Sequence, residues 1–244
     1  MKPEVRHVAA HMRELGIGSM QHAMRLSLYN GGDNSWWSEL SVLQAAHAAE
    51  ILIKARIASE HPLLIFDQLP RPTPGRRDQL DVADLFEKGR TIQYAELPER
   101  LWATTGIHIP HPDIYLRFGR LRNTIQHFAA PNEHLNRQTL EFIANVVDPF
   151  IGEQWGLFAI DYNEECGDHY EHIFDSLVDW NVRLRISPRA AHYWKRIGYA
   201  PGPDAPRGYA SWFRKAMKAA LAMPDPSASR SAMFSKSRKA TTDE

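Results

Sequence analysis

The sequence predicts an all-α protein with a helical, charge-polarised C-terminal extension. Nearly every apolar stretch repeats at the helical period, and convincing alternation of the strand type is absent. Breaks rich in glycine and proline separate these stretches. The chain has 244 residues, of which 43% are hydrophobic and 24% are charged, as is usual for globular proteins.

The first half of the chain divides at clear break signals. We expect a first helix that stops at Gly16 and Gly18, and a short second helix over 19–29. The turn "NGGDNS" can cap a long helix, which we expect over 36–59. The prolines of "LPRPTPG" then mark a loop.

The second half continues with helices. Short helices are expected over 80–88 and 97–104, and Pro112 suits the first turn of the next helix. Another follows over 137–153. Beyond these we expect an acidic helical stretch up to Trp180 and basic helices over 188–197 and 209–222. The predicted organisation is a bundle over 1–155, an extension over 156–222 and a disordered tail over 223–244, which is small, polar and punctuated by proline.

Charge is distributed unevenly although the formal net charge is +0. The segment 161–181 has seven acidic residues and no Lys or Arg, whereas 183–239 has thirteen basic residues and two acidic ones. Two explanations stay open. The segments form solvated faces that partly neutralise each other, or the basic one binds a phosphate backbone.

Several features bear on the compartment. Cys166 is a single cysteine, so an intramolecular disulfide is excluded. No apolar run approaches the roughly 18 residues that span a bilayer. Basic and histidine residues interrupt the first helix, unlike a secretory signal. We therefore expect a cytoplasmic protein without a membrane partner.

The stretch "GRLRNTIQHF" at 119–128 places polar groups on an otherwise apolar helix. At about 100° per residue, one side forms an expected core stripe of Ile114, Phe118, Leu121, Ile125 and Phe128. The opposite side carries Leu116, Arg120, Asn123 and His127. Arg122 lies about 140° around the helix from His127, so the pair suggests a symmetric dimer. Gly119 predicts a kink or a close packing contact.

The long helix over 36–59 carries an unusual polar line. His47, Glu50 and Lys54 follow one another between apolar borders, beside an apolar face of Val42, Ala46, Ala49 and Ile53. One explanation is an ion pair between Glu50 and Lys54, which contributes about 0.5 kcal/mol. The other is that Glu50 faces a shared polar site and influences the charge of Arg122 or His127.

Three segments, in order, are "LSVLQAAHAAEILIKARIASEHPLLIF", "RTIQYAELPERL" and "LRFGRLRNTIQHF". Together they resemble the HEPN domain family of prokaryotic toxin and defence systems, over about 36–150. The family signature is an Arg, usually a polar residue next, and a His after four intervening positions, here Arg122, Asn123 and His127. The resemblance implies an antiparallel helical bundle that often dimerises.

The resemblance also implies a function, a metal-independent endoribonuclease of a toxin–antitoxin or phage-defence system. Arg122, Asn123 and His127 would be catalytic, with Glu50, His47 and Lys54 supporting them. Histidine can move a proton while a ribose 2′-OH attacks the phosphate, and arginine can hold the phosphate oxygens. Products would carry a 2′,3′-cyclic phosphate and a 5′-OH.

The implied partners are RNA, a second copy through the Arg122/His127 helix, and an antitoxin or defence protein, with no cofactor. The alternative is a non-catalytic HEPN-like module for RNA or nucleotide binding or for dimerisation.

Two further groups of residues have side chains that could bind ligands but have a more common structural explanation. Cys166, His169 and His172 have metal-ligand side chains, but a regular helix spreads them apart, so we expect no metal site. Trp194 and Trp212 lie among basic residues, where tryptophans can stack on bases, although packing is their commoner role.

Overall fold

The computed structural model describes residues 7–29, 36–69, 85, 87–128, 134–162 and 169–224. The chain is all-α, which confirms the predicted fold class. It forms two compact units, Met1–Leu157 and Phe158–Glu244, whereas the sequence placed the boundary between 155 and 156. The predicted tail from 225 onward lies outside the described residues.

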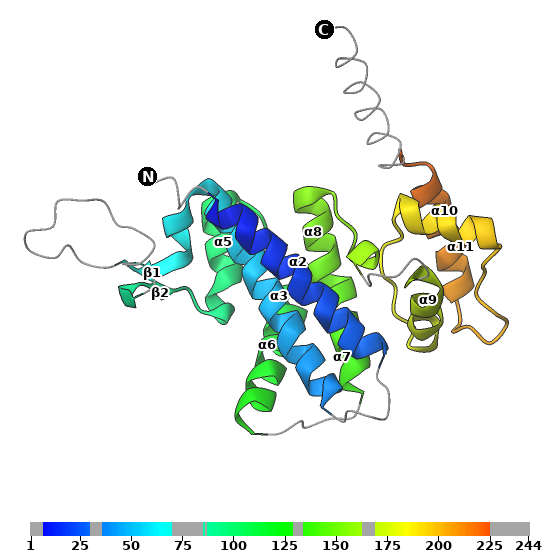
Figure 1. Cartoon of the computed structure of the whole chain (residues 1–244), viewed down its shortest axis with the longest axis horizontal. Helices are drawn as coiled ribbons and strands as arrows, with labels where there is room; N and C mark the ends of the chain where they lie inside the picture. Colours follow the sequence, from blue (N-terminus) through cyan, green and yellow to red (C-terminus); the bar gives the residue numbers. More distant parts are fainter. Residues whose placement is uncertain are drawn as a thin grey trace, which may run out of the picture. The chain divides into compact units, whose positions relative to one another are not determined.

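The first unit is built on two long helices, α2 (Val8–Leu28) and α3 (Trp37–Glu60), which run side by side (Figure 1). The predicted stop at Gly16 and Gly18 is wrong, because α2 continues through both glycines. A Cβ at Gly16 would lie 2.7 Å from Cγ of Leu52 on α3. This glycine therefore serves close helix packing instead of ending a helix.

Helix α3 is the centre of the first unit. It contacts α2, α5 (Leu97–Thr105), α6 (Pro112–His127) and α7 (Leu135–Phe142). Its predicted apolar face is fully buried, and burial extends further around the helix to Leu52 and Ile57. A buried hydrogen bond of 2.9 Å joins Ser41 of α3 to Thr139 of α7.

Between α3 and α5 the chain is less regular. The 3₁₀ turn η1 (Pro62–Ile65) leads into β1 (Phe66–Gln68), which pairs antiparallel with β2 (Arg90–Thr91). The expectation of no strands therefore needs a small correction, a two-stranded ribbon too short to alternate visibly. A second 3₁₀ turn, η2 (Tyr94–Glu96), precedes α5. Most of the predicted helix over 80–88 lies outside the described residues.

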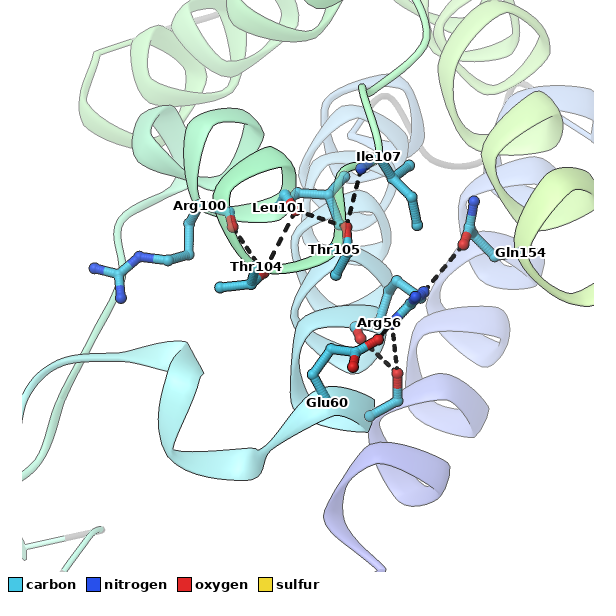
Figure 2. A network of polar contacts seen from close by, with 9 residues as sticks. Arg56, Glu60, Arg100, Leu101, Thr104, Thr105, Ile107 and Gln154 are labelled. Carbon is cyan, nitrogen blue, oxygen red and sulfur yellow. Dashed lines mark hydrogen bonds and ion pairs between the residues drawn. The ribbon is translucent and has the colours of Figure 1, made fainter.

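The predicted helix over 137–153 is present, but it is interrupted by a wider turn. Helix α7 passes through the π-helical turn η3 (Ile143–Val147) into α8 (Asp148–Trp155). Pro149 explains the turn, since proline has no N–H and its ring crowds the carbonyl of residue i−4, here Asn145 within η3. Nε of Arg56 on α3 donates to Oε1 of Gln154 on α8 over 3.1 Å. Figure 2 shows the two side chains facing each other.

The second unit comprises η4 (Ala159–Tyr162), α9 (His169–Asp179), α10 (Pro188–Ile197) and α11 (Tyr209–Leu221). The two basic helices match their predicted positions. The core is aromatic, with Phe174 edge-on to Trp194 and Phe213 at centroid distances of 4.6 and 4.7 Å. Trp194 is 0% exposed. Base stacking by Trp194 is therefore ruled out, and its role is packing.

Candidate functional site

Helix α6 presents the predicted polar face to solvent. Pro112 and Asp113 occupy its first turn, where a missing N–H and a negative charge are both favourable. The helix ends at His127. The residues expected opposite the core, Leu116, Arg120, Asn123 and His127, are all exposed.

The core face of α6 differs from the predicted stripe. The buried residues are Tyr115, Phe118 and Gly119. Phe128 is 90% exposed, and the other predicted core residues except Phe118, namely Ile114, Leu121 and Ile125, are half-buried. The buried face of α6 is rotated relative to the predicted stripe because contacts with aromatic rings set the orientation of the helix. Phe118 stacks on Phe142 at 3.9 Å, and the ring of Tyr94 covers Gly119.

This rotation turns Arg122 toward the protein. By helical geometry Arg122 lies within about 60° of the buried Tyr115, Phe118 and Gly119, and its side chain is half-buried. Its Nη1 donates to Oδ1 of Asn123 over 3.0 Å. The guanidinium therefore orients Asn123, whose Nδ2 amide hydrogens are left to donate elsewhere.

Two tyrosines connect Arg122 with α3. Burial raises the pKa values of Tyr94 and Tyr115 above the usual range for tyrosine. The negative charge of Glu50 raises both pKa values further, and the positive charge of Arg122 lowers them. Glu50 and Arg122 therefore act on the same tyrosine pair from different helices.

Glu50 is also paired within α3. Nζ of Lys54 donates to Oε1 of Glu50 over 2.6 Å and to the Thr91 hydroxyl over 3.3 Å. The side chains of Lys54 and Glu50 are only 6% and 18% exposed. The ion pair of the first explanation is therefore present, and Lys54 also reaches β2, whereas a polar site shared by Glu50 with Arg122 or His127 stays a prediction. His47, the third residue of that line, is exposed.

The structure brings some of the predicted site residues together and leaves others apart. Arg122 contacts Asn123 and Glu50 contacts Lys54, and the charges of Glu50 and Arg122 both act on the pKa values of the tyrosine pair. His127 and His47 form no contact with Arg122 within the described part of the chain. Arg122 and His127 also point about 140° apart on the same helix. One copy of the chain therefore does not assemble all three signature side chains.

A groove lies beside the exposed face of α6. It has a volume of about 330 Å³ and runs between α6 and α7, over the stacked rings of Phe118 and Phe142. Arg117 and Arg120 line its α6 side, and Glu141 lines the α7 side. Glu141 accepts a hydrogen bond of 2.8 Å from Arg137, which leaves the arginines of α6 as the cationic wall.

Sequence reasoning missed Tyr94, Tyr115 and Thr91. One signal was available for Tyr115, which lies seven residues before Arg122 and hence on almost the same line of the helix. Gly119 lies between them and offered a second signal. Tyr94 and Thr91 come from an irregular segment, where periodicity carries no information about contacts.

The sequence predicted no metal site and left two roles open for Trp212. Cys166 and the side chains of His169 and His172 lie outside the description, while the described residues contain no group of three or more His, Cys, Asp or Glu that could hold a metal ion. Trp212 is half-buried, with the Arg183 guanidinium 6.0 Å from its ring centroid. Among the described helices, none is both long and apolar enough to cross a membrane.

Comparisons of the chain with protein-family models, with curated proteins and with solved structures find no match.

Proposed function

We propose that the chain is a metal-independent endoribonuclease whose active site forms on α6 when two copies pair. One observation carries the proposal. The exposed face of α6 holds an imidazole, an amide and an arginine, His127, Asn123 and Arg120, with Arg122 bonded to that amide. Asp113, in the first turn, is the one acidic residue of α6. The face is therefore suited to a phosphodiester.

The chemistry follows from the side chains. His127 takes the proton of a ribose 2′-OH while its oxygen attacks the adjacent phosphorus. The bond from phosphorus to the 5′-oxygen breaks, that oxygen takes a proton from water, and a 2′,3′-cyclic phosphate remains. An arginine guanidinium stabilises the charge that develops on the phosphate oxygens. The free Nδ2 amide of Asn123 is a further donor to those oxygens.

Pairing of two copies accounts for the divergence of the signature residues. Arg122 of one copy and His127 of the other then border one RNA phosphate. Leu116, on the same side of α6 as His127, and Phe128, next to His127 in the chain, are both exposed and supply apolar surface that a second copy of α6 covers. The resemblance of this helix to the HEPN signature supports the same arrangement.

The test is cleavage of total cellular RNA by the purified chain in EDTA. We expect wild type to cut and to leave cyclic phosphate ends, and His127→Ala to be slower by about 100-fold or more. Arg122→Ala should also lose activity, and thermal unfolding shows whether it is folded. His22→Ala is the matched control, because His22 is an exposed histidine on α2.

Cleavage by none of the proteins, or equal cleavage by all of them, would overturn the ribonuclease proposal. Metal-dependent cleavage lost in EDTA would do the same.

A second function, a non-catalytic module for RNA binding or dimerisation, is favoured by the position of Arg122. Its half-buried side chain beside Tyr94 and Tyr115 suits a structural role. In that case Arg122→Ala lowers the melting temperature, His127→Ala changes neither stability nor RNA binding, and wild type does not cleave. The same protein preparations distinguish the two functions.

A further inference from the structure

One face of α10, in the second unit, combines cations with aromatic rings. Arg189, His192, Tyr193 and Arg196 fall within about 100° of one another around the helix. Arg189, His192 and Arg196 are exposed, and Tyr193 is half-buried. Ala190, Ala191 and Trp194, on the other side, are buried. This set of four residues is called the α10 face below.

The arginines of the α10 face stack on tyrosines. The guanidinium carbon of Arg189 is 5.9 Å from the ring centroid of Tyr170, and that of Arg196 is 5.1 Å from Tyr193. The two tyrosine rings are themselves 5.5 Å apart. The four groups form a continuous row of cation, ring, ring and cation. A guanidinium over a ring is ordered while it can still donate hydrogen bonds from its edge.

The charges on this face are available to a partner. Among the described residues no ion pair joins Arg189 or Arg196 to a carboxylate. Asp161, which also acts on Tyr170, accepts from the hydroxyls of Tyr170 and Ser187 over 2.8 and 2.5 Å. Over residues 183–224 there are nine basic residues and one acidic residue, Asp204. Both arginines of the α10 face are therefore available to an anion, beside the acidic segment 161–181 of the same unit.

His192 adds a directional group between the arginines. Its Nδ1 lies 2.7 Å from the carbonyl oxygen of Pro188, and since a carbonyl only accepts, Nδ1 is the donor. The ring is thus fixed with Nε2 left for another partner. The α10 face offers two guanidiniums, an imidazole nitrogen and an aromatic ring along about 10 Å of helix.

We propose that the α10 face is a binding surface for single-stranded RNA. The guanidiniums of Arg189 and Arg196 contact two phosphates of the strand, and a base extends the row by stacking on the outer face of the Arg196 guanidinium, which Tyr193 holds in place. An acidic peptide would use the cations but has no planar group for the row of rings, so the observations favour a nucleic acid. The proposal rests on the proposed function in one respect, that RNA is the substrate.

The test measures binding of a fluorescein-labelled oligouridylate to the full chain by anisotropy at several salt concentrations. All variants carry His127→Ala, so that the probe stays intact. We expect Arg189→Gln with Arg196→Gln to weaken binding by about tenfold or more, and to reduce the slope of log K against log salt by about 1.4. Tyr193→Leu should weaken binding, whereas Tyr193→Phe should retain it.

The matched control removes the same charge from α11 through Arg214→Gln and Lys218→Gln, both exposed. We expect a loss below about threefold, because these residues lie outside the α10 face. Equal losses in the two double variants would show diffuse attraction and overturn the proposal. Absence of binding, or tighter binding of polyglutamate than of the oligouridylate, would overturn it too. Thermal melting confirms that each variant is folded.

Cleavage by chains with intact His127 separates this proposal from the ribonuclease. An active wild type whose KM is unchanged by Arg189→Gln with Arg196→Gln contradicts the α10 surface alone. A wild type that binds through the α10 face without cleaving contradicts the ribonuclease alone. If both proposals hold, that double variant raises KM and leaves kcat nearly unchanged.

Discussion

Tyr94 and Tyr115 stack face to face, with ring centroids 4.2 Å apart and parallel planes. The Tyr115 hydroxyl donates to the Tyr94 carbonyl over 2.9 Å, and the Tyr94 hydroxyl donates to the Tyr115 carbonyl over 3.4 Å. This reciprocal pair fastens η2 to α6. Because Glu50 and Arg122 both act on it, the pair links the polar line of α3 to the signature helix.

Replacing Gly119 with alanine tests the close contact between this glycine and the ring of Tyr94. A Cβ at Gly119 would lie 2.4 Å from Cε1 of Tyr94, whose ring is held by Tyr115. We expect Gly119→Ala to lower the free energy of unfolding by about 1–3 kcal/mol, measured in urea. In a Tyr94→Leu background the loss should shrink, since the ring is gone. An equal loss of stability in both backgrounds would show that the strain does not come from the contact with Tyr94.

Two glycines of α2 form a matched pair of tests. Alanine at Gly16 would meet Leu52, whereas alanine at Gly18 has nothing within 4 Å. Gly18→Ala should therefore raise the free energy of unfolding by up to about 1 kcal/mol, as helix propensity predicts. Gly16→Ala should lower it by about 1–3 kcal/mol through overpacking. The same sign for both variants would refute the close approach of α2 and α3.

Alkaline pH should destabilise the first unit through the tyrosine pair. Burial raises the folded-state pKa of Tyr94 and Tyr115, so the unfolded chain loses these protons first. Stability is then complete below the ordinary tyrosine pKa of about 10 and falls above it, by up to about 1.4 kcal/mol per pH unit for each tyrosine. Urea unfolding at increasing pH measures this slope. Replacing both tyrosines with Phe should reduce it, and an unchanged slope would contradict the assignment.

The pair of Glu50 and Lys54 should matter more than an exposed pair of the same spacing. Glu50→Gln leaves the Lys54 ammonium, only 6% exposed, without its carboxylate and should cost about 3 kcal/mol in urea unfolding. Arg137 and Glu141 are 51% and 43% exposed at the same spacing, so Glu141→Gln should cost below about 1 kcal/mol. Similar losses for the two variants would mean that Lys54 reaches water or another anion.

The sequence was most informative where local signals decide structure. Helix α10 begins at Pro188 and ends before Gly198, and α6 begins at Pro112, as predicted. The exposure of Asn123 and His127 also followed from helical periodicity alone. Gly16 was wrongly interpreted as the end of a helix. In a sequence, a glycine that ends a helix cannot be distinguished from one that allows close packing, here against Leu52.

The orientation of α6 about its own axis could not be predicted from the sequence, for a related reason. Hydropathy ranks Leu121 and Ile125 above a tyrosine and a glycine as core residues. The buried face is instead set by the ring of Tyr94, which comes from an irregular turn 25 positions before Gly119. Arg122 consequently lies against the protein, and the tyrosine pair on the same side of α6 was missed.

The most direct test of the proposed active site is to mix two inactive variants, Arg122→Ala and His127→Ala, and to measure RNA cleavage in EDTA. If each site takes Arg122 from one copy and His127 from the other, a mixed dimer retains one intact site. Random exchange of subunits should then restore about one quarter of wild-type activity. A mixture no more active than its separate components, beside an active wild type, would contradict a site shared between two copies.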